Sequence, residues 1–159
     1  MCSSDLIMKV LDAGAMGVVI PLVNNRQDAE RAVAACLYPP KGMRSAGPVR
    51  ARLYSGDDYV AHANDEIVIA VMIETAEGLA NIDEILSTPG VNACYVGPTD
   101  LSFALGLTPR GDNPDPKHQE TVAKILEACK RHGVAGGIQC QGVEYANKWL
   151  DLGYQMVTL

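Results

Sequence analysis

The chain has 159 residues, of which 48% are hydrophobic and 20% are charged, and its formal net charge at pH 7 is −6. This composition is that of a globular chain with one sizeable core, and the acidic balance argues against a nucleic-acid surface. No apolar run approaches the length of a membrane span, so no membrane partner is expected.

Apolar periodicity predicts helices and strands that alternate along the chain, with two long loops rich in Pro and Gly. Strands are predicted at 17–23, 67–74, 92–97, 134–140 and 154–159, and helices at 7–14, 24–38, 59–66, 76–90, 99–106, 117–133 and 142–153, with loops at 39–57 and 108–116. Near-continuous apolar strands separated by helices indicate a parallel α/β sheet covered on both faces. Periodicity alone leaves a barrel segment and a doubly wound sheet both open. No G-x-G-x-x-G motif follows a strand, so a nucleotide-binding sheet has no support.

The five cysteines are Cys2, Cys36, Cys94, Cys129 and Cys140, and none forms a C-x-x-C pair. We expect buried free thiols in a reducing cytoplasm rather than disulfides or zinc ligands, which also makes the predicted location cytoplasmic. Cys140 ends a predicted strand and is the one thiol whose reactivity is worth testing.

Two predicted strands are each ended or closely followed by an acidic residue. The run that begins at Ile67 stops at Glu74, and the next strand runs through Gly97 and Pro98 to Asp100. In parallel α/β folds the carboxyl ends of the strands form the active site. Two carboxylates at one edge can hold a divalent cation and leave positions for water and substrate. The free N–H groups near Thr99 could receive a substrate carboxylate.

Each acid also has a simpler interpretation. Glu74 could belong to the N-cap of the helix opened by "ETAEG", and Asp100 could interact with the helix dipole at the start of the next helix. For either acid alone we favour this interpretation. Because both acids follow buried strands, we favour the metal site for the pair.

Five segments carry a resemblance that covers nearly everything after residue 6: "GAMGVVIPLV", "YPPKGMRSAGPVRA", "ANDEIVIAVMIETAEGLANIDEIL", "GPTDLSFALG" and "LDLGYQMVTL". They resemble the HpcH/HpaI family of class II, pyruvate-dependent aldolases. The two acids lie 26 positions apart, as the family's two metal ligands do. The resemblance implies a (β/α)8 TIM barrel, a homo-oligomer (hexamer or trimer), and Mg²⁺, Mn²⁺ or Co²⁺ as the cofactor.

By resemblance, Glu74 and Asp100 are the metal ligands, while Gly97, Pro98, Thr99 and Asp100 bind the substrate. Arg44, in the "KGMRSAG" loop, is expected to line the entrance. The implied reaction is the (retro-)aldol cleavage of a 2-keto-3-deoxy sugar acid or a 4-hydroxy-2-oxo acid to pyruvate and an aldehyde, through a metal-stabilised enolate. The sequence departs from the family at Met72, where many members have Gln, in the "MRSAG" loop, and in the longer "TPRGDNPDP" segment.

The N-terminal part of the chain departs further from the family pattern. A family barrel needs about 250 residues, and by register "GVVIPLV" resembles its fourth strand and "YQMVTL" its eighth. The chain therefore resembles strands 4 to 8 of the barrel, with 7–159 as the C-terminal part of one aldolase domain. Residues 1–6 are predicted to be a non-native scar, because "CSSDL" matches the translation of a common sequencing adapter. The family's catalytic histidine and arginine would lie in the missing part, so we expect this chain by itself to be inactive.

The three histidines are His62, His118 and His132, and none replaces the family base convincingly. We expect all three at the surface.

Two other functions compete with the aldolase. The related citrate-lyase-β or malyl-CoA lyase branch uses a similar Glu and Asp pair and would require an acyl-CoA substrate. A non-enzymatic structural or sugar-acid-binding remnant would instead place the two carboxylates too far apart to share an ion.

Overall fold

The computed structural model describes residues 4–159, and each predicted strand has a counterpart in it. The strands are β1 Gly17–Ile20, β2 Val68–Ile73, β3 Ala93–Val96, β4 Ala135–Gln139 and β5 Met156–Thr158. The helices are α1 Ser4–Asp12, α2 Arg26–Cys36, α3 Arg50–Ser55, α4 Tyr59–Glu66, α5 Ala76–Ala80, α6 Ile82–Leu86, α7 Pro98–Ala104, α8 Pro116–His132 and α9 Val143–Leu152.

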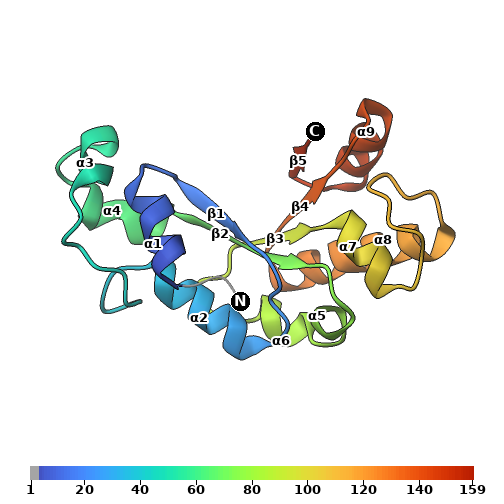
Figure 1. Ribbon diagram of the computed structural model, residues 1–159, viewed down its shortest axis with the longest axis horizontal. Helices are drawn as coiled ribbons and strands as arrows, with labels where there is room; N and C mark the ends of the chain where they lie inside the picture. Colours follow the sequence, from blue (N-terminus) through green and yellow to red (C-terminus); the bar gives the residue numbers. More distant parts are fainter. Residues whose placement is uncertain (1–3) are drawn as a thin grey trace.

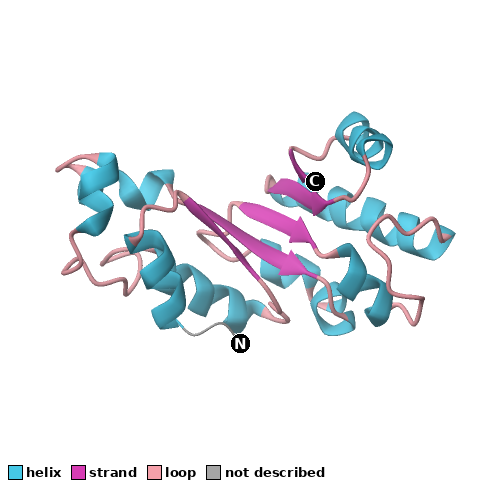
Figure 2. Ribbon diagram, turned by 45° about the horizontal axis from the view of Figure 1, so that its top comes forward, coloured by secondary structure: helices cyan, strands magenta, loops and turns pink. Residues whose placement is uncertain are grey.

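The five strands form one sheet whose order follows the sequence, β1-β2-β3-β4-β5, and every neighbouring pair is parallel. Figures 1 and 2 show the strands fanning into a curled sheet, with α2, α5, α6 and α8 gathered on one side of it. This is a parallel α/β fold with the curvature of part of a barrel.

The two faces of the sheet are packed differently. Alternate strand residues such as Ile69, Val71 and Cys94 join the helices in one large core. The intervening residues on the other face, Ala70 and Tyr95 among them, form a small cluster of strand residues only. The expectation of helices on both faces is therefore wrong for the part of the chain that the structure describes. A curled sheet turns its concave face inward, and that face receives no helix.

Some helices begin or end at other residues than predicted. The predicted loop 39–57 contains a short helix, α3, and the predicted helix 76–90 is two short helices that meet at Asn81. Asn25 caps α2 as expected, with its side-chain oxygen accepting a hydrogen bond from the Asp28 N–H. The long helix α8 ends at Gly133, whose φ of 66° is the left-handed conformation that favours glycine.

The thiols of Cys36, Cys94, Cys129 and Cys140 are free and buried, as predicted, and Cys2 lies outside the described residues. Burial raises the pKa of Cys140 to about 11, which leaves little thiolate at neutral pH. We therefore expect Cys140 to be unreactive.

Two further predictions concern the ends of the chain and the membrane. Residues 4–6 of the predicted scar begin α1, and residues 1–3 lie outside the described residues. Within residues 4–159, no helix has both the length and the apolarity needed to cross a bilayer.

Candidate metal and substrate site

The Glu74 carboxylate lies at the carboxyl end of β2, on the concave face of the sheet. Side chains alternate along a strand, so Glu74 follows Ala70 and Met72 on the face that carries no helix. The side chain is only 4% exposed. A buried carboxylate needs compensating partners.

One partner is a backbone amide from the neighbouring strand. The Leu22 N–H, just after β1, donates to Glu74 Oε1 at 3.0 Å. Leu22 has a φ of 57° and is the non-glycine residue with positive φ in the described part of the chain. This conformation is unfavourable for a leucine, and strain of this kind is found where the backbone must present a group to a site. Here it directs an amide at the Glu74 carboxylate.

The other side of the carboxylate is closed by Gly97, which follows β3. The register pairs Ile73 with Val96, so Glu74 and Gly97 come next on adjacent strands. A Cβ on Gly97 would overlap Glu74 Oε2 and lie 2.8 Å from the Met72 methyl carbon. Only glycine leaves space for the carboxylate in this position.

Asp100 lies in the first turn of α7, directly after Gly97 and Pro98, with its side chain exposed. Burial raises the pKa of Glu74, the hydrogen bond from Leu22 lowers it, and the negative charge of Asp100 raises it again. Asp100 comes three residues after Gly97, which borders the Glu74 carboxylate, so the two acids lie at the same edge of the sheet. Such a pair favours a bound cation.

Helix capping does not account for Glu74. The N-cap of α5 is Thr75, whose hydroxyl oxygen accepts from the Gly78 N–H at 2.9 Å. The Glu74 side chain instead accepts from the N–H of Leu22, just after the neighbouring strand β1. The alternative in which Glu74 only starts a helix therefore fails on this contact.

The donor set suits a hard divalent cation. Within residues 4–159 there is no cluster of three or more His, Cys, Asp or Glu side chains, so the protein offers a pair of carboxylates rather than a closed cage. Mg²⁺ and similar ions are commonly held by one or two carboxylates and keep their other positions for water and substrate. Glu74 and Asp100 fit that pattern.

The chain matches the model of the HpcH/HpaI aldolase/citrate lyase family over residues 1–159. It belongs to that family. It is 42% identical over 152 residues to a hydroxypyruvate/pyruvate aldolase from Rhizorhabdus wittichii, with 96% of this chain and 61% of the relative covered. It is 36% identical over 156 residues to a 5-keto-4-deoxy-D-glucarate aldolase from Escherichia coli, with 97% and 60% covered.

The fold agrees with the family. A crystal structure of an HpcH/HpaI aldolase/citrate lyase family protein from Burkholderia cenocepacia is similar with a TM-score of 0.88 and 35% sequence identity. The comparison covers 99% of this chain and 63% of that one. This HpcH/HpaI chain thus spans about three fifths of the length of the relatives it matches.

The 107–115 loop follows the helix that carries Asp100 and is held by polar contacts. Asn113 Nδ2 donates to Ser102 Oγ at 3.0 Å and to the Thr108 carbonyl at 3.2 Å. The Asn113 carbonyl in turn accepts from the Tyr145 hydroxyl at 3.1 Å, and the Gln141 N–H, beyond β4, donates to Asp112 Oδ1 at 2.9 Å. The loop is therefore fixed between α7 and the end of β4, at the same edge as Asp100.

Arg44 is not brought to this edge by the chain that the structure describes. Its side chain is buried, with Nη2 2.7 Å from Asp12 Oδ1 and Nη1 donating to the Tyr59 hydroxyl at 3.0 Å. Asp12 ends the helix that leads into β1, so the pair lies near the strand starts. Figure 2 shows the strand arrows pointing away from α3 and α4, which adjoin this region. The expectation that Arg44 lines the entrance is corrected accordingly.

The histidine predictions hold for two of the three residues. His62 is exposed beside Asp58, and His132 is partly exposed and pairs with Asp83 at 2.8 Å. His118 is fully buried, so its predicted surface location is wrong. It lies in α8 on the same face as Val122 and Ile125, which pack in the core.

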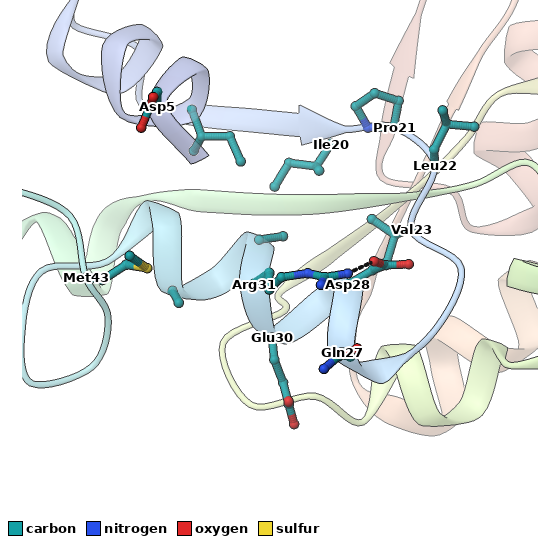
Figure 3. A pocket seen from close by; sticks show the side chains of 13 residues that line it. Asp5, Ile20, Pro21, Leu22, Val23, Gln27, Asp28, Glu30, Arg31 and Met43 are labelled. Atoms are coloured by element: carbon teal, nitrogen blue, oxygen red, sulfur yellow. Dashed lines mark hydrogen bonds and ion pairs between the residues drawn. The ribbon is translucent and has the colours of Figure 1, made fainter. Parts of the chain in front are cut away.

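One cavity reaches Leu22, the residue whose N–H bonds to Glu74, but extends from there along the helices. It measures about 720 Å³ and opens between α1, the end of β1 and α2, where Figure 3 shows Ile20, Val23 and the paired Asp28 and Arg31. Neither Glu74 nor Asp100 lines it. The candidate site is therefore defined by its carboxylates and not by this cavity.

Proposed function

We propose that this chain carries the metal- and pyruvate-binding residues of a class II aldolase. The reaction is the cleavage of a 2-keto-3-deoxy sugar acid or a 4-hydroxy-2-oxo acid to pyruvate and an aldehyde. The observation that carries the proposal is the buried Glu74 carboxylate, held beside Asp100 at the strand ends of an HpcH/HpaI family member. The relatives named as aldolases support the same chemistry.

Each residue has a separate task in this proposal. Glu74 and Asp100 hold Mg²⁺, Mn²⁺ or Co²⁺, and Leu22 fixes the orientation of the Glu74 carboxylate through its N–H. The cation, when bound, supplies positive charge that stabilises negative charge developing on the keto oxygen of the substrate. Gly97 keeps the space beside the carboxylate free of side-chain atoms.

The first turn of α7 is the proposed binding place for the substrate carboxylate. The Thr99 and Asp100 N–H groups belong to the first turn of the helix and therefore have no intrahelical acceptor, while Pro98 has no N–H to offer. Amide groups in this position attract anions.

The wider architecture is also part of the proposal. We take the five strands as strands 4 to 8 of a (β/α)8 barrel, which agrees with the similarity to the longer Burkholderia cenocepacia chain. The helix-free concave face would then turn toward the barrel axis. The homo-oligomer remains a prediction that light scattering can check.

No histidine among the described residues is in a position to transfer protons at this edge. His62 lies in α4 at the opposite end of the sheet, His132 ends α8 paired with Asp83, and His118 is buried. We therefore expect this chain to bind Mn²⁺ and pyruvate without turnover.

Titration calorimetry with Mn²⁺, with and without pyruvate, tests the proposal. The unmodified chain should bind the ion, and Glu74→Gln and Asp100→Asn should each weaken binding by at least about tenfold. Asp83→Asn is the matched control, because Asp83 is an acid paired with Arg131 and His132 on the surface. Equal affinity in all four proteins, or no binding by the unmodified chain, would reject the site. Rapid pyruvate release from a 4-hydroxy-2-oxo acid would reject the expected lack of turnover.

A further inference from the structure

A small network of buried polar side chains lies behind the turn that carries Asp100. Its members are Ser102 in α7, Asn113 in the adjoining loop and His118 in the first turn of α8, each less than 5% exposed. Ser102 and His118 both contact the carbonyl oxygen of Pro98, the first residue of α7, and Asn113 bonds to Ser102. Buried polar side chains are costly unless they form such bonds.

His118 Nε2 lies 3.0 Å from the Pro98 carbonyl oxygen. A carbonyl only accepts, so Nε2 carries the proton and donates it. The other ring nitrogen, Nδ1, is buried and has no hydrogen-bond partner among residues 4–159. Burial also lowers the pKa of His118, while the bond to Pro98 and the charge of Asp115 raise it. His118 is thus a neutral imidazole whose one donor is directed at Pro98.

The Ser102 hydroxyl does not donate to the Pro98 carbonyl all of the time. Its hydroxyl lies 2.8 Å from the Pro98 carbonyl oxygen and 3.1 Å from the Arg110 carbonyl oxygen. A hydroxyl has one proton, so Ser102 donates to one of these carbonyls at a time. His118 has no second acceptor for its Nε2 proton among the described contacts. It is therefore the constant side-chain donor to the Pro98 carbonyl, beside the backbone N–H of Ser102 that the helix directs there.

The Pro98 carbonyl matters because of its position in the chain. It lies between Gly97, which leaves space for the Glu74 carboxylate, and Asp100. Movement of this peptide would carry Asp100 and the first-turn N–H groups with it. We propose that His118 is a positioning residue, which fixes the Gly97–Asp100 turn through the Pro98 carbonyl and so holds Asp100 beside Glu74. This rests on the proposed function of that site.

The test combines two variants at His118 with a control from the same helix. His118→Leu removes the donor at similar volume, and His118→Gln retains an N–H donor. The control is Val122→Ala, because Val122 is equally buried one turn further along α8 and is not among the residues bonded to Pro98. All four proteins are examined as the full chain, first without metal and then with Mn²⁺ alone.

Hydrogen exchange in the metal-free chain gives the first result. The Leu101 N–H, which donates to the Gly97 carbonyl at 2.9 Å, reports on the turn, and the Ile85 N–H, which donates to the Asn81 carbonyl, serves as the reference. His118→Leu should raise exchange at Leu101 about fivefold more than at Ile85. Val122→Ala should raise both rates by the same factor, and His118→Gln should stay close to the unmodified chain. Equal factors at both amides in His118→Leu would overturn the proposal.

Mn²⁺ affinity gives the second result. His118→Leu should bind about tenfold more weakly, whereas His118→Gln and Val122→Ala should stay within about twofold of the unmodified chain. An affinity in His118→Leu equal to that of the unmodified chain, or an equal loss in Val122→Ala, would also overturn the proposal. If the unmodified chain binds no Mn²⁺, the proposed function fails, and the exchange comparison still decides the role of His118.

Discussion

The two ends of the sheet treat buried charge in opposite ways. Near the strand starts, Arg44 is enclosed with an opposite charge: it bonds to Asp12 and Tyr59, and its guanidinium lies 4.6 Å from the centre of the Tyr38 ring. At the strand ends, Glu74 is buried with one backbone donor and a second negative charge, Asp100, nearby. The first arrangement is complete within the chain, and the second leaves negative charge uncompensated.

This difference separates stability from function. In barrel folds the face at the strand starts serves stability and the face at the strand ends carries catalysis. A structural site satisfies its own charges, whereas a binding site retains the charge that its ligand will neutralise. Variants at the two ends should therefore affect different measurements.

The largest effect is expected at the Arg44 end. Asp12→Ala leaves the Arg44 guanidinium buried without its carboxylate, which should lower the free energy of unfolding by about 3–5 kcal/mol. Urea denaturation measures this loss, and the Mn²⁺ affinity of the folded fraction should not change. The double variant Asp12→Leu with Arg44→Met removes both charges and should recover most of the stability. A double variant as unstable as Asp12→Ala would show that packing, not charge pairing, is responsible.

Gly97→Ala should have the next largest effect. The new Cβ would meet Glu74 Oε2, and forcing the two apart should cost about 1–3 kcal/mol of stability and weaken Mn²⁺ binding. Thermal or urea unfolding gives the first quantity and calorimetry the second. In a Glu74→Ala background the stability cost of Gly97→Ala should fall, since the carboxylate is absent. An unchanged cost would mean that the contact with Met72 dominates.

Glu74→Gln should separate stability from binding in a single residue. The raised pKa of Glu74 means that its charged form is disfavoured in the folded chain, so removing the charge should stabilise the metal-free protein by up to about 1 kcal/mol. The amide oxygen can still accept from Leu22. Urea denaturation without metal should show the gain, while Mn²⁺ titration shows the loss of binding. A clear loss of stability would contradict the proposed contrast between the two ends.

The smallest effect concerns pH. The pKa of His118 is lowered in the folded chain, whereas in the unfolded chain it has the ordinary histidine value of about 6.5. At pH values below about 6.5 the unfolded chain therefore binds more protons than the folded chain. The contribution of His118 to stability is complete above that pH and is lost as the pH falls through it, by at most about 0.7 kcal/mol between pH 7 and pH 6. His118→Leu should lack this component. Unfolding curves at the two pH values, compared between variant and unmodified chain, measure it, and identical pH dependence would refute it.

The sequence located the acids because strand endings are local features. Apolar runs that stop at Glu74 and reach Asp100 through Gly97 and Pro98 need no tertiary knowledge to be recognised. The parallel sheet and its five strands followed from the same alternation. The helix boundary at Asn81 was not predicted, because the apolar stripe of 76–90 continues through the break.

What could not be predicted depended on distant partners. Arg44 comes from a Pro- and Gly-rich loop, and nothing local indicates that Asp12 will neutralise it. The left-handed backbone of Leu22 has no signature in its residue type. His118 did leave a signal, because it precedes Val122 by four and Ile125 by seven positions, on the apolar stripe of α8. Residue type favours a surface position for a histidine, whereas this spacing places His118 in the core.

The anchoring of the 107–115 loop has a consequence for how the site could evolve or be engineered. The carbonyl groups of Thr108 and Arg110 are held by Asn113 and Ser102, whereas the side chains of Thr108, Pro109 and Arg110 are exposed. Hydrogen bonds to a backbone carbonyl do not depend on which side chain that residue carries. Substitutions at these three positions should therefore leave the main-chain contacts of the loop, and with them its conformation, intact.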